Sequence, residues 1–137
     1  SKQRRNQRLD LKMQNDNANW GPKVFIPQVP TRRNPDTNEV EEVHDLSPAY
    51  LYGDLTPLVS PTCKPFDPDS FLPDMLAGLE DAEPTDYFLP IGNQVLMVAA
   101  GIVMESVTGG PLNVLRWDGR ERRYDVVTID FTTIFES

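Results

Sequence analysis

The stretch NVLRWDGRERRYDVVTIDF, residues 113–131, alternates between apolar and polar side chains on both sides of a turn. Before the turn, Leu115 and Trp117 share one face of an extended chain, while Arg116 and Asp118 share the other. The alternation resumes after a short polar segment that begins with glycine, so the pattern predicts a β-hairpin. One apolar face against one charged face also predicts that Trp117 is buried in a sheet covered on a single side.

Upstream of the hairpin, residues 93–107 are apolar at almost every position. Asn93 is a favourable N-cap and the glycines at 109–110 are a favourable stop, so we predict a helix that is buried in a core. The many β-branched residues leave a second interpretation open, in which two strands meet at a kink at Gly101. We favour the helix because about fifteen residues with a cap at each end is long for one strand.

A second helix is predicted from around Ser70, because Phe71, Met75 and Leu79 recur every four residues on one face. A proline in its opening turn is compatible with a helix start. The predicted fold class is α+β, with a compact unit over residues 66–137 in which a buried helix packs on a β-hairpin or antiparallel sheet.

Most of the chain before this unit is predicted to be extended. Twelve of the thirteen prolines lie between Pro22 and Pro90, and each removes a backbone donor and disfavours helix in the preceding residue. We therefore describe residues 20–65 as an extended, proline-rich segment with short edge strands. Within it we expect a strand at 23–26, a solvated loop at 31–45, an extended piece at 50–52 and an edge strand at 55–59.

Charge is segregated along the chain, whose net charge is -8. Residues 1–33 carry eight basic and two acidic groups, residues 34–90 carry one and thirteen, and residues 91–137 carry four and six. Residues 1–19 have too little apolar content to order themselves, so we predict a basic flexible arm. Contacts of the arm with a partner or with nucleic acid are assigned to Lys2, Arg4, Arg5, Arg8 and Lys12.

Composition argues against several classes of protein. With 39% hydrophobic residues and a longest apolar run of Val95 to Met104, the chain offers no transmembrane helix. The basic start is followed by polar residues, so we expect no signal peptide and no secretion by that route. A single cysteine excludes an internal disulfide.

Catalytic and metal-binding chemistry find little support. Cys63 and His44 are the only residues of their types, and neither lies in a nucleophile signature. Zinc would need more Cys and His ligands, and Asp67, Asp69 and Asp74 resemble an acidic helix start more than a calcium loop. We therefore expect a non-enzymatic protein without cofactor or metal.

Nucleic-acid contact has two candidate locations. The basic arm could neutralise phosphates non-specifically, and the arginines at the hairpin turn could act with Trp117 and Tyr124 on a single-stranded base. Interleaved acids make the turn close to neutral, so the arm is the favoured candidate.

These features together predict a structural or assembly subunit. An extended, proline-rich chain with a charged arm would bury its apolar residues against neighbouring subunits, as arms do in virus or phage particles. The expected protein contacts of the extended segment are Trp20, Phe25, Ile26, Tyr50 and Tyr52. The predicted location is the virion or the host cytoplasm. The alternative is a small acidic regulatory protein that binds or imitates nucleic acid at a polymerase or nuclease.

Overall fold

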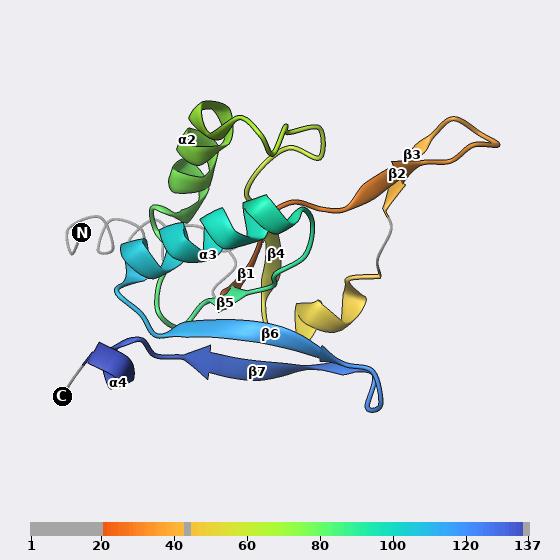
Figure 1. Cartoon of the computed structure of the whole chain (residues 1–137). Helices are drawn as coiled ribbons and strands as arrows, with labels where there is room; N and C mark the ends of the chain where they lie inside the picture. The colour runs from red at the N-terminus through yellow and green to blue at the C-terminus, as the bar shows by residue number, and fades with distance from the viewer. Residues whose placement is uncertain (1–20, 43–44, 136–137) are drawn as a thin grey trace, which may run out of the picture.

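The computed structural model describes residues 21–42 and 45–135 and has an α+β fold, as predicted (Figure 1). Five strands form one sheet in the order β4-β1-β5-β6-β7, and β2 and β3 form a separate two-stranded sheet. The strands are β1 Lys23–Ile26, β2 Thr31–Arg33, β3 Val40–Glu42, β4 Asp54–Pro57, β5 Tyr87–Phe88, β6 Leu112–Asp118 and β7 Arg123–Ile129. The helices are η1 Ser47–Leu51, a 3-10 helix, and α2 Pro68–Leu79, α3 Gln94–Thr108 and α4 Thr132–Phe135.

The main sheet is mixed in direction. Strands β4, β1, β5 and β6 run parallel to their neighbours, and only the β6–β7 pair is antiparallel. This pair is the predicted hairpin, with a continuous register from Leu112 opposite Ile129 to Asp118 opposite Arg123. The prediction of the hairpin is confirmed, but it is the edge of a larger sheet that includes strands from the proline-rich segment.

Both long helices are present where the sequence predicts them. In α2, Phe71, Met75 and Leu79 are buried, although the helix begins at Pro68 and so places Pro73 beyond the opening turn. In α3, the Asn93 side chain accepts a hydrogen bond of 2.8 Å from the backbone N–H of Val95. This cap and the continuous helix from Gln94 to Thr108 exclude the alternative of two strands that meet at a kink at Gly101.

The C-terminal end of α3 requires a glycine. Gly109 has a φ of 78°, in the left-handed region that other residues rarely adopt, and its N–H donates to the carbonyl of Glu105. The chain therefore leaves the helix and turns directly into β6.

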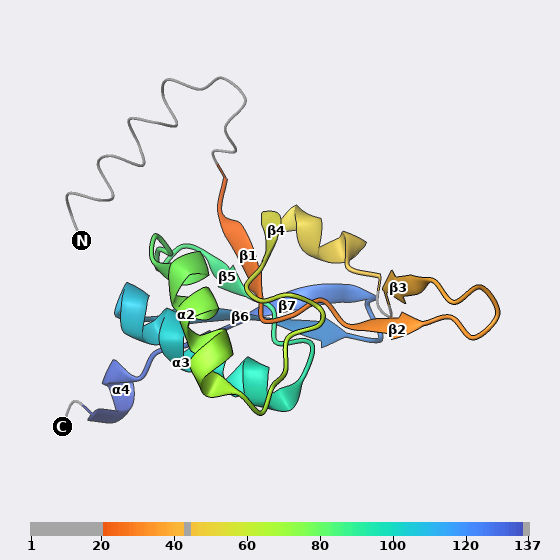
Figure 2. The same cartoon turned by 90° about the horizontal axis from the view of Figure 1, so that it is seen from above.

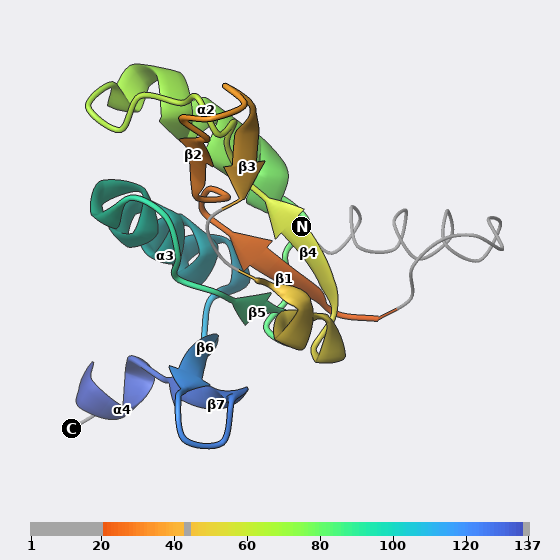
Figure 3. The ribbon, with the colours of Figure 1, turned by 90° about the vertical axis from the view of Figure 1, so that its right-hand side faces the viewer.

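Apolar clusters lie on both faces of the sheet, so the expectation of a sheet covered on a single side is wrong. The ribbon shows α2 and α3 on one side of the sheet and η1 on the other (Figures 2 and 3). Helices α2 and α3 pack on one face, where Phe25, Phe88 and Leu112 contribute from the strands. Helix η1 lies on the other face, and its buried residue Ala49 belongs to the same apolar cluster as Ile26 and Leu115. Side chains alternate along each strand, so a strand between two layers supplies apolar residues to both.

Three local expectations for the proline-rich segment are corrected. Strand β1 is interior, between β4 and β5, and not at an edge. Residues 50–52 are not extended, because Tyr50 and Leu51 close η1 and Tyr52 caps it. The expected loop at 31–45 contains the β2–β3 hairpin, in which the N–H of Asn34 donates to the carbonyl of Glu39. In contrast, β4 is an edge strand, as expected for a strand that contains proline.

None of the helices within the described ranges combines the length and apolar character needed to cross a membrane.

Trp117 does not have the buried position predicted for it, since 44% of its surface is exposed. Its ring lies edge-on to Tyr124, with 5.0 Å between ring centroids, and Tyr124 is only 8% exposed. The two residues are directly opposite in the β6–β7 register. Trp117 therefore covers the buried Tyr124 from the solvent side.

Because of this difference in exposure, Trp117→Ala should lower the free energy of unfolding by only about 1 kcal/mol, and Tyr124→Ala by about 3 kcal/mol. Denaturant unfolding of both variants beside the wild type tests the order. A larger loss for Trp117→Ala would show that this indole is buried in the folded protein.

Candidate protein interface

Helix α3 presents an apolar face to solvent. Val95, Val98 and Ile102 are 52%, 63% and 63% exposed, while Leu96 and Ala100 are buried against the sheet. The expectation of a helix buried all round is therefore wrong. A helix that packs on one sheet and one neighbouring helix buries only a stripe of its surface, so the remaining apolar positions of α3 face outward.

The outward face of α3 borders a groove along α2. Its lining includes Leu72 from α2 and Val98 from α3, and it is a shallow depression, open to solvent, with a volume of about 470 Å³. We call this the α2–α3 groove, and its full lining is Pro68, Phe71, Leu72, Gln94, Val95, Val98, Ala99 and Ile102. None of these eight residues carries a charge, so a partner's apolar side chains can bind in the groove without removing water from an ionised group of its lining.

A second, smaller hollow of about 260 Å³ lies on the other side of Val98 and Ile102. Phe131 and Leu112 contribute to its lining, together with Glu105. Val98 and Ile102 thus form a ridge between two hollows. Large exposed apolar patches of this kind on soluble proteins mark interaction sites.

Acidic side chains flank the start of α2. Asp67 and Asp69 lie on either side of the groove residue Pro68, and Asp74 follows one turn later; all three are exposed. We call these three residues the acidic rim. Residues 66–90 contain seven acids and no lysine or arginine, and the nearest preceding basic residue is Lys64, whose backbone carbonyl accepts a hydrogen bond from the N–H of Asp67.

Cys63 is a half-buried free thiol whose pKa depends on the carboxylates of the acidic rim. Burial raises the pKa of this thiol, and the carboxylates of Asp74 and Asp67 raise it further because they disfavour a nearby thiolate. A higher pKa leaves less thiolate at a given pH.

We therefore expect iodoacetamide to alkylate Cys63 at pH 8 more slowly than it alkylates a free cysteine. The double variant Asp67→Asn, Asp74→Asn should react faster than the wild type. Asp36→Asn, in the distant β2–β3 turn, is the matched control and should leave the rate unchanged. Equal rates for the double variant and the control would contradict the proximity of the rim to the thiol.

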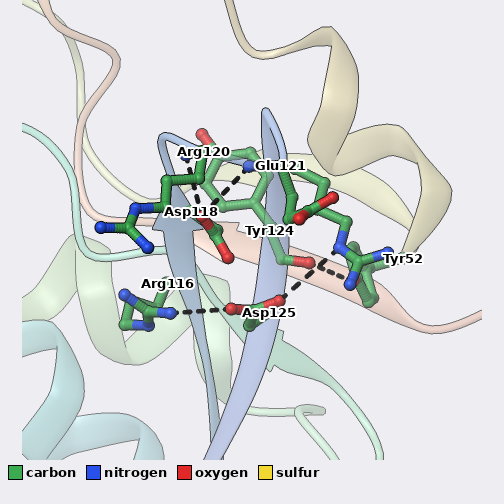
Figure 4. A network of polar contacts seen from close by, with 8 residues as sticks. Tyr52, Arg116, Asp118, Arg120, Glu121, Tyr124 and Asp125 are labelled. Carbon is green, nitrogen blue, oxygen red and sulfur yellow. Dashed lines mark hydrogen bonds and ion pairs between the residues drawn. The ribbon is translucent and has the colours of Figure 1, made fainter.

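The hairpin turn is organised by its own polar contacts (Figure 4). The carboxylate of Asp118 accepts hydrogen bonds from the backbone N–H groups of Arg120 and Glu121, at 2.9 and 3.2 Å. These bonds lower the pKa of Asp118. Arg116 pairs across the strands with Asp125 at 2.8 Å.

A hollow of about 480 Å³ lies beside Trp117, on the opposite sheet face from the α2–α3 groove. Its lining includes Tyr124, Arg116 and Asp45. Burial, and then the charge of Asp45, raises the pKa of Tyr124. Acidic groups thus lie among the arginines here, and Asp125 already engages Arg116, which weakens the case for a phosphate-binding surface.

The predicted contact residues that the structure describes differ in exposure, and some of them are buried in the core. Phe25 and Ile26 are 2% and 0% exposed and lie inside the chain's own core, so they offer no surface to a partner. Tyr50 is 63% exposed. Tyr52 is half-buried, and its hydroxyl donates to the carbonyl of Tyr124. Trp20 and the arm residues Lys2, Arg4, Arg5, Arg8 and Lys12 lie outside the described residues.

The groove was not predicted from the sequence, although a signal for it exists. Ten apolar residues in a fifteen-residue helix exceed what one stripe can bury. The excess indicates either a fully enclosed helix or an exposed apolar face, and within residues 21–42 and 45–135 the one other long helix, α2, is not enough to enclose α3. As to metal binding, residues 21–42 and 45–135 contain no group of three or more His, Cys, Asp or Glu side chains placed to hold an ion.

Comparison with known proteins gives one result. A family model described as "Phage Pam3 gp32-like protein" matches residues 22–131. The match spans all five strands of the main sheet and both walls of the α2–α3 groove. No curated protein and no solved structure matches the chain.

Proposed function

The chain belongs to the family of Phage Pam3 gp32-like proteins and is a phage protein, and from this premise we propose that it is a non-enzymatic structural subunit of the phage particle. In this function it is anchored to neighbouring protein subunits by the α2–α3 groove and by its basic N-terminal arm. The observation that carries the proposal is the groove, whose eight lining residues are uncharged and whose ridge residues Val98 and Ile102 are both 63% exposed.

The energetics of exposure support an interface. Each aliphatic side chain that moves from water into a contact contributes about 1.5 to 3 kcal/mol, so several such residues at one site can hold a subunit in place. In a chain with a net charge of -8, the uncharged lining of the groove also means that a partner meets no ionised group on the groove floor itself.

The test is the copy number of the protein in purified phage particles, measured by quantitative mass spectrometry against the major particle proteins. The proposal expects many copies in a fixed ratio to the other subunits. Absence from particles, together with a one-to-one complex with a polymerase or nuclease in infected cells, would contradict it and support the alternative of an acidic regulatory protein.

A further inference from the structure

We propose that the α2–α3 groove of one copy binds the N-terminal arm of a neighbouring copy, with Leu9, Leu11 and Met13 of the arm on the apolar floor and its basic residues at the acidic rim. This inference rests on the proposed function and names the partner of the groove. The occupant is a segment of the same chain, supplied by a second molecule.

The apolar pattern of the arm fits the groove. Leu9, Leu11 and Met13 are spaced by two, so in an extended chain they project from one side and span about 13 Å. On α3, the exposed residues Val95 and Ile102 are seven positions apart, which corresponds to about 10 Å along the helix axis. Three side chains at this spacing match the length of the exposed apolar face.

The charges of the two surfaces are complementary. Residues 1–13 contain Lys2, Arg4, Arg5, Arg8 and Lys12 against the single acid Asp10. Asp67 and Asp69 precede and follow the groove residue Pro68 in the chain, and residues 66–90, which include the α2 wall of the groove, contain seven acids and no lysine or arginine. Pairing the α3 faces of two copies would instead bring two acidic rims together, so charge favours the arm over a second α3 as the occupant.

The topology favours an arm from another molecule. Strands β4, β1 and β5 are parallel, so their carboxyl ends lie at the same end of the sheet. Helices α2 and α3 follow β4 and β5 in the chain, so the groove residues Pro68 and Gln94, at the starts of these helices, lie toward that end. The chain enters β1 at Lys23, at the opposite, amino-terminal end of these strands. An arm of the same molecule would have to reverse its direction and pass back beside the four-residue strand β1 to reach the groove, whereas an arm from a neighbour can approach the groove directly.

A contact between an arm and a groove is heterologous, because each copy donates one surface and accepts with another. Such contacts generate rings or open chains of subunits. They also permit a complementation experiment with full-length proteins. The arm variant carries Leu9→Asp and Leu11→Asp, and the groove variant carries Val98→Asp and Ile102→Asp.

Sedimentation analysis of each protein alone is the first measurement. The wild type should associate, and association should weaken at 0.5 M salt because exposed charge pairs are screened. Each double variant should associate roughly 100-fold more weakly, as expected for the loss of two buried aliphatic contacts. The matched control is Tyr50→Asp, Leu51→Asp, which adds the same charge at exposed positions of η1 on the other sheet face and should associate like the wild type.

Mixing the two double variants is the second measurement. The groove variant supplies an intact arm and the arm variant an intact groove, so the mixture should form a two-chain complex and nothing larger. Wild-type association of the arm variant, a monomeric wild type, or a mixture that stays monomeric would each overturn the inference. Copy number in particles is measured independently, so the proposed function can stand if this pairing fails.

Discussion

Replacing Phe25 with alanine should lower the free energy of unfolding by about 4 kcal/mol, by removing a large aromatic side chain from the centre of the core. Phe25 is 2% exposed and belongs to the apolar cluster beneath α2 and α3. Its strand is hydrogen-bonded on both sides, to β4 and β5, so the backbone cannot move to fill the cavity.

Phe66→Ala is the matched control, because it removes the same side chain at a position that is 78% exposed. It should change stability by less than about 0.5 kcal/mol. Thermal and denaturant unfolding of both variants makes the comparison. If Phe25→Ala unfolds no earlier than Phe66→Ala, then strand β1 is not part of the core, and the expectation that the proline-rich segment packs on neighbours would be restored.

Asp86→Ala should be nearly as damaging, with a loss of about 3 kcal/mol. The carboxylate is 3% exposed and accepts hydrogen bonds from two backbone N–H groups, that of Lys23 at 2.9 Å and that of Glu83 at 2.8 Å. Alanine leaves both partly buried donors without their acceptor, and each unsatisfied donor costs about 1 to 3 kcal/mol when it is shielded from water.

Asp86→Asn separates the loss of charge from the loss of an acceptor. Asparagine keeps one carbonyl oxygen but directs an NH₂ group at the second donor, so its stability should lie between those of the wild type and Asp86→Ala. Denaturant unfolding at neutral pH measures all three proteins. Equal stability of Asp86→Ala and the wild type would contradict the anchoring of β1 by this side chain.

The parts of the fold that the sequence predicts correctly are those with local signals. The hairpin follows from strict alternation around a turn, and α3 from its caps at Asn93 and Gly109. Helix α2 follows from three apolar residues spaced by four. In each case the interactions that select the structure lie within a few residues of one another.

The errors concern contacts between distant segments. Prolines correctly indicate that residues 23–26 are extended, but only the pairing with β4 and β5 makes this strand interior. The same pairing buries Phe25 and Ile26, which sequence patterns alone cannot distinguish from apolar residues on a partner surface. The exposure of Trp117 differs from the prediction because alternation identifies which side of a strand a residue faces and does not show how far the covering layer extends.

The exposed face of α3 also depends on contacts between distant segments, so the sequence alone does not predict it. The apolar composition of α3 is evident in the sequence, but which residues face the sheet depends on where α2 and the strands lie. The exposed positions Val98 and Ile102 therefore became candidates only in the folded chain. The acidic rim, in contrast, can be identified in the sequence, because Asp67, Asp69 and Asp74 lie within eight residues of one another.

The most direct test of the arm and groove pairing is a disulfide cross-link between two different full-length proteins. Both carry Cys63→Ser, one adds Leu11→Cys and the other adds Val98→Cys, so a bond between positions 11 and 98 can form only between molecules. After mild oxidation of the mixture, we expect a cross-linked pair whose linked peptides contain residues 11 and 98, and much less product when Leu51→Cys replaces Val98→Cys. No link between positions 11 and 98, or an equal yield with Leu51→Cys, would contradict the pairing.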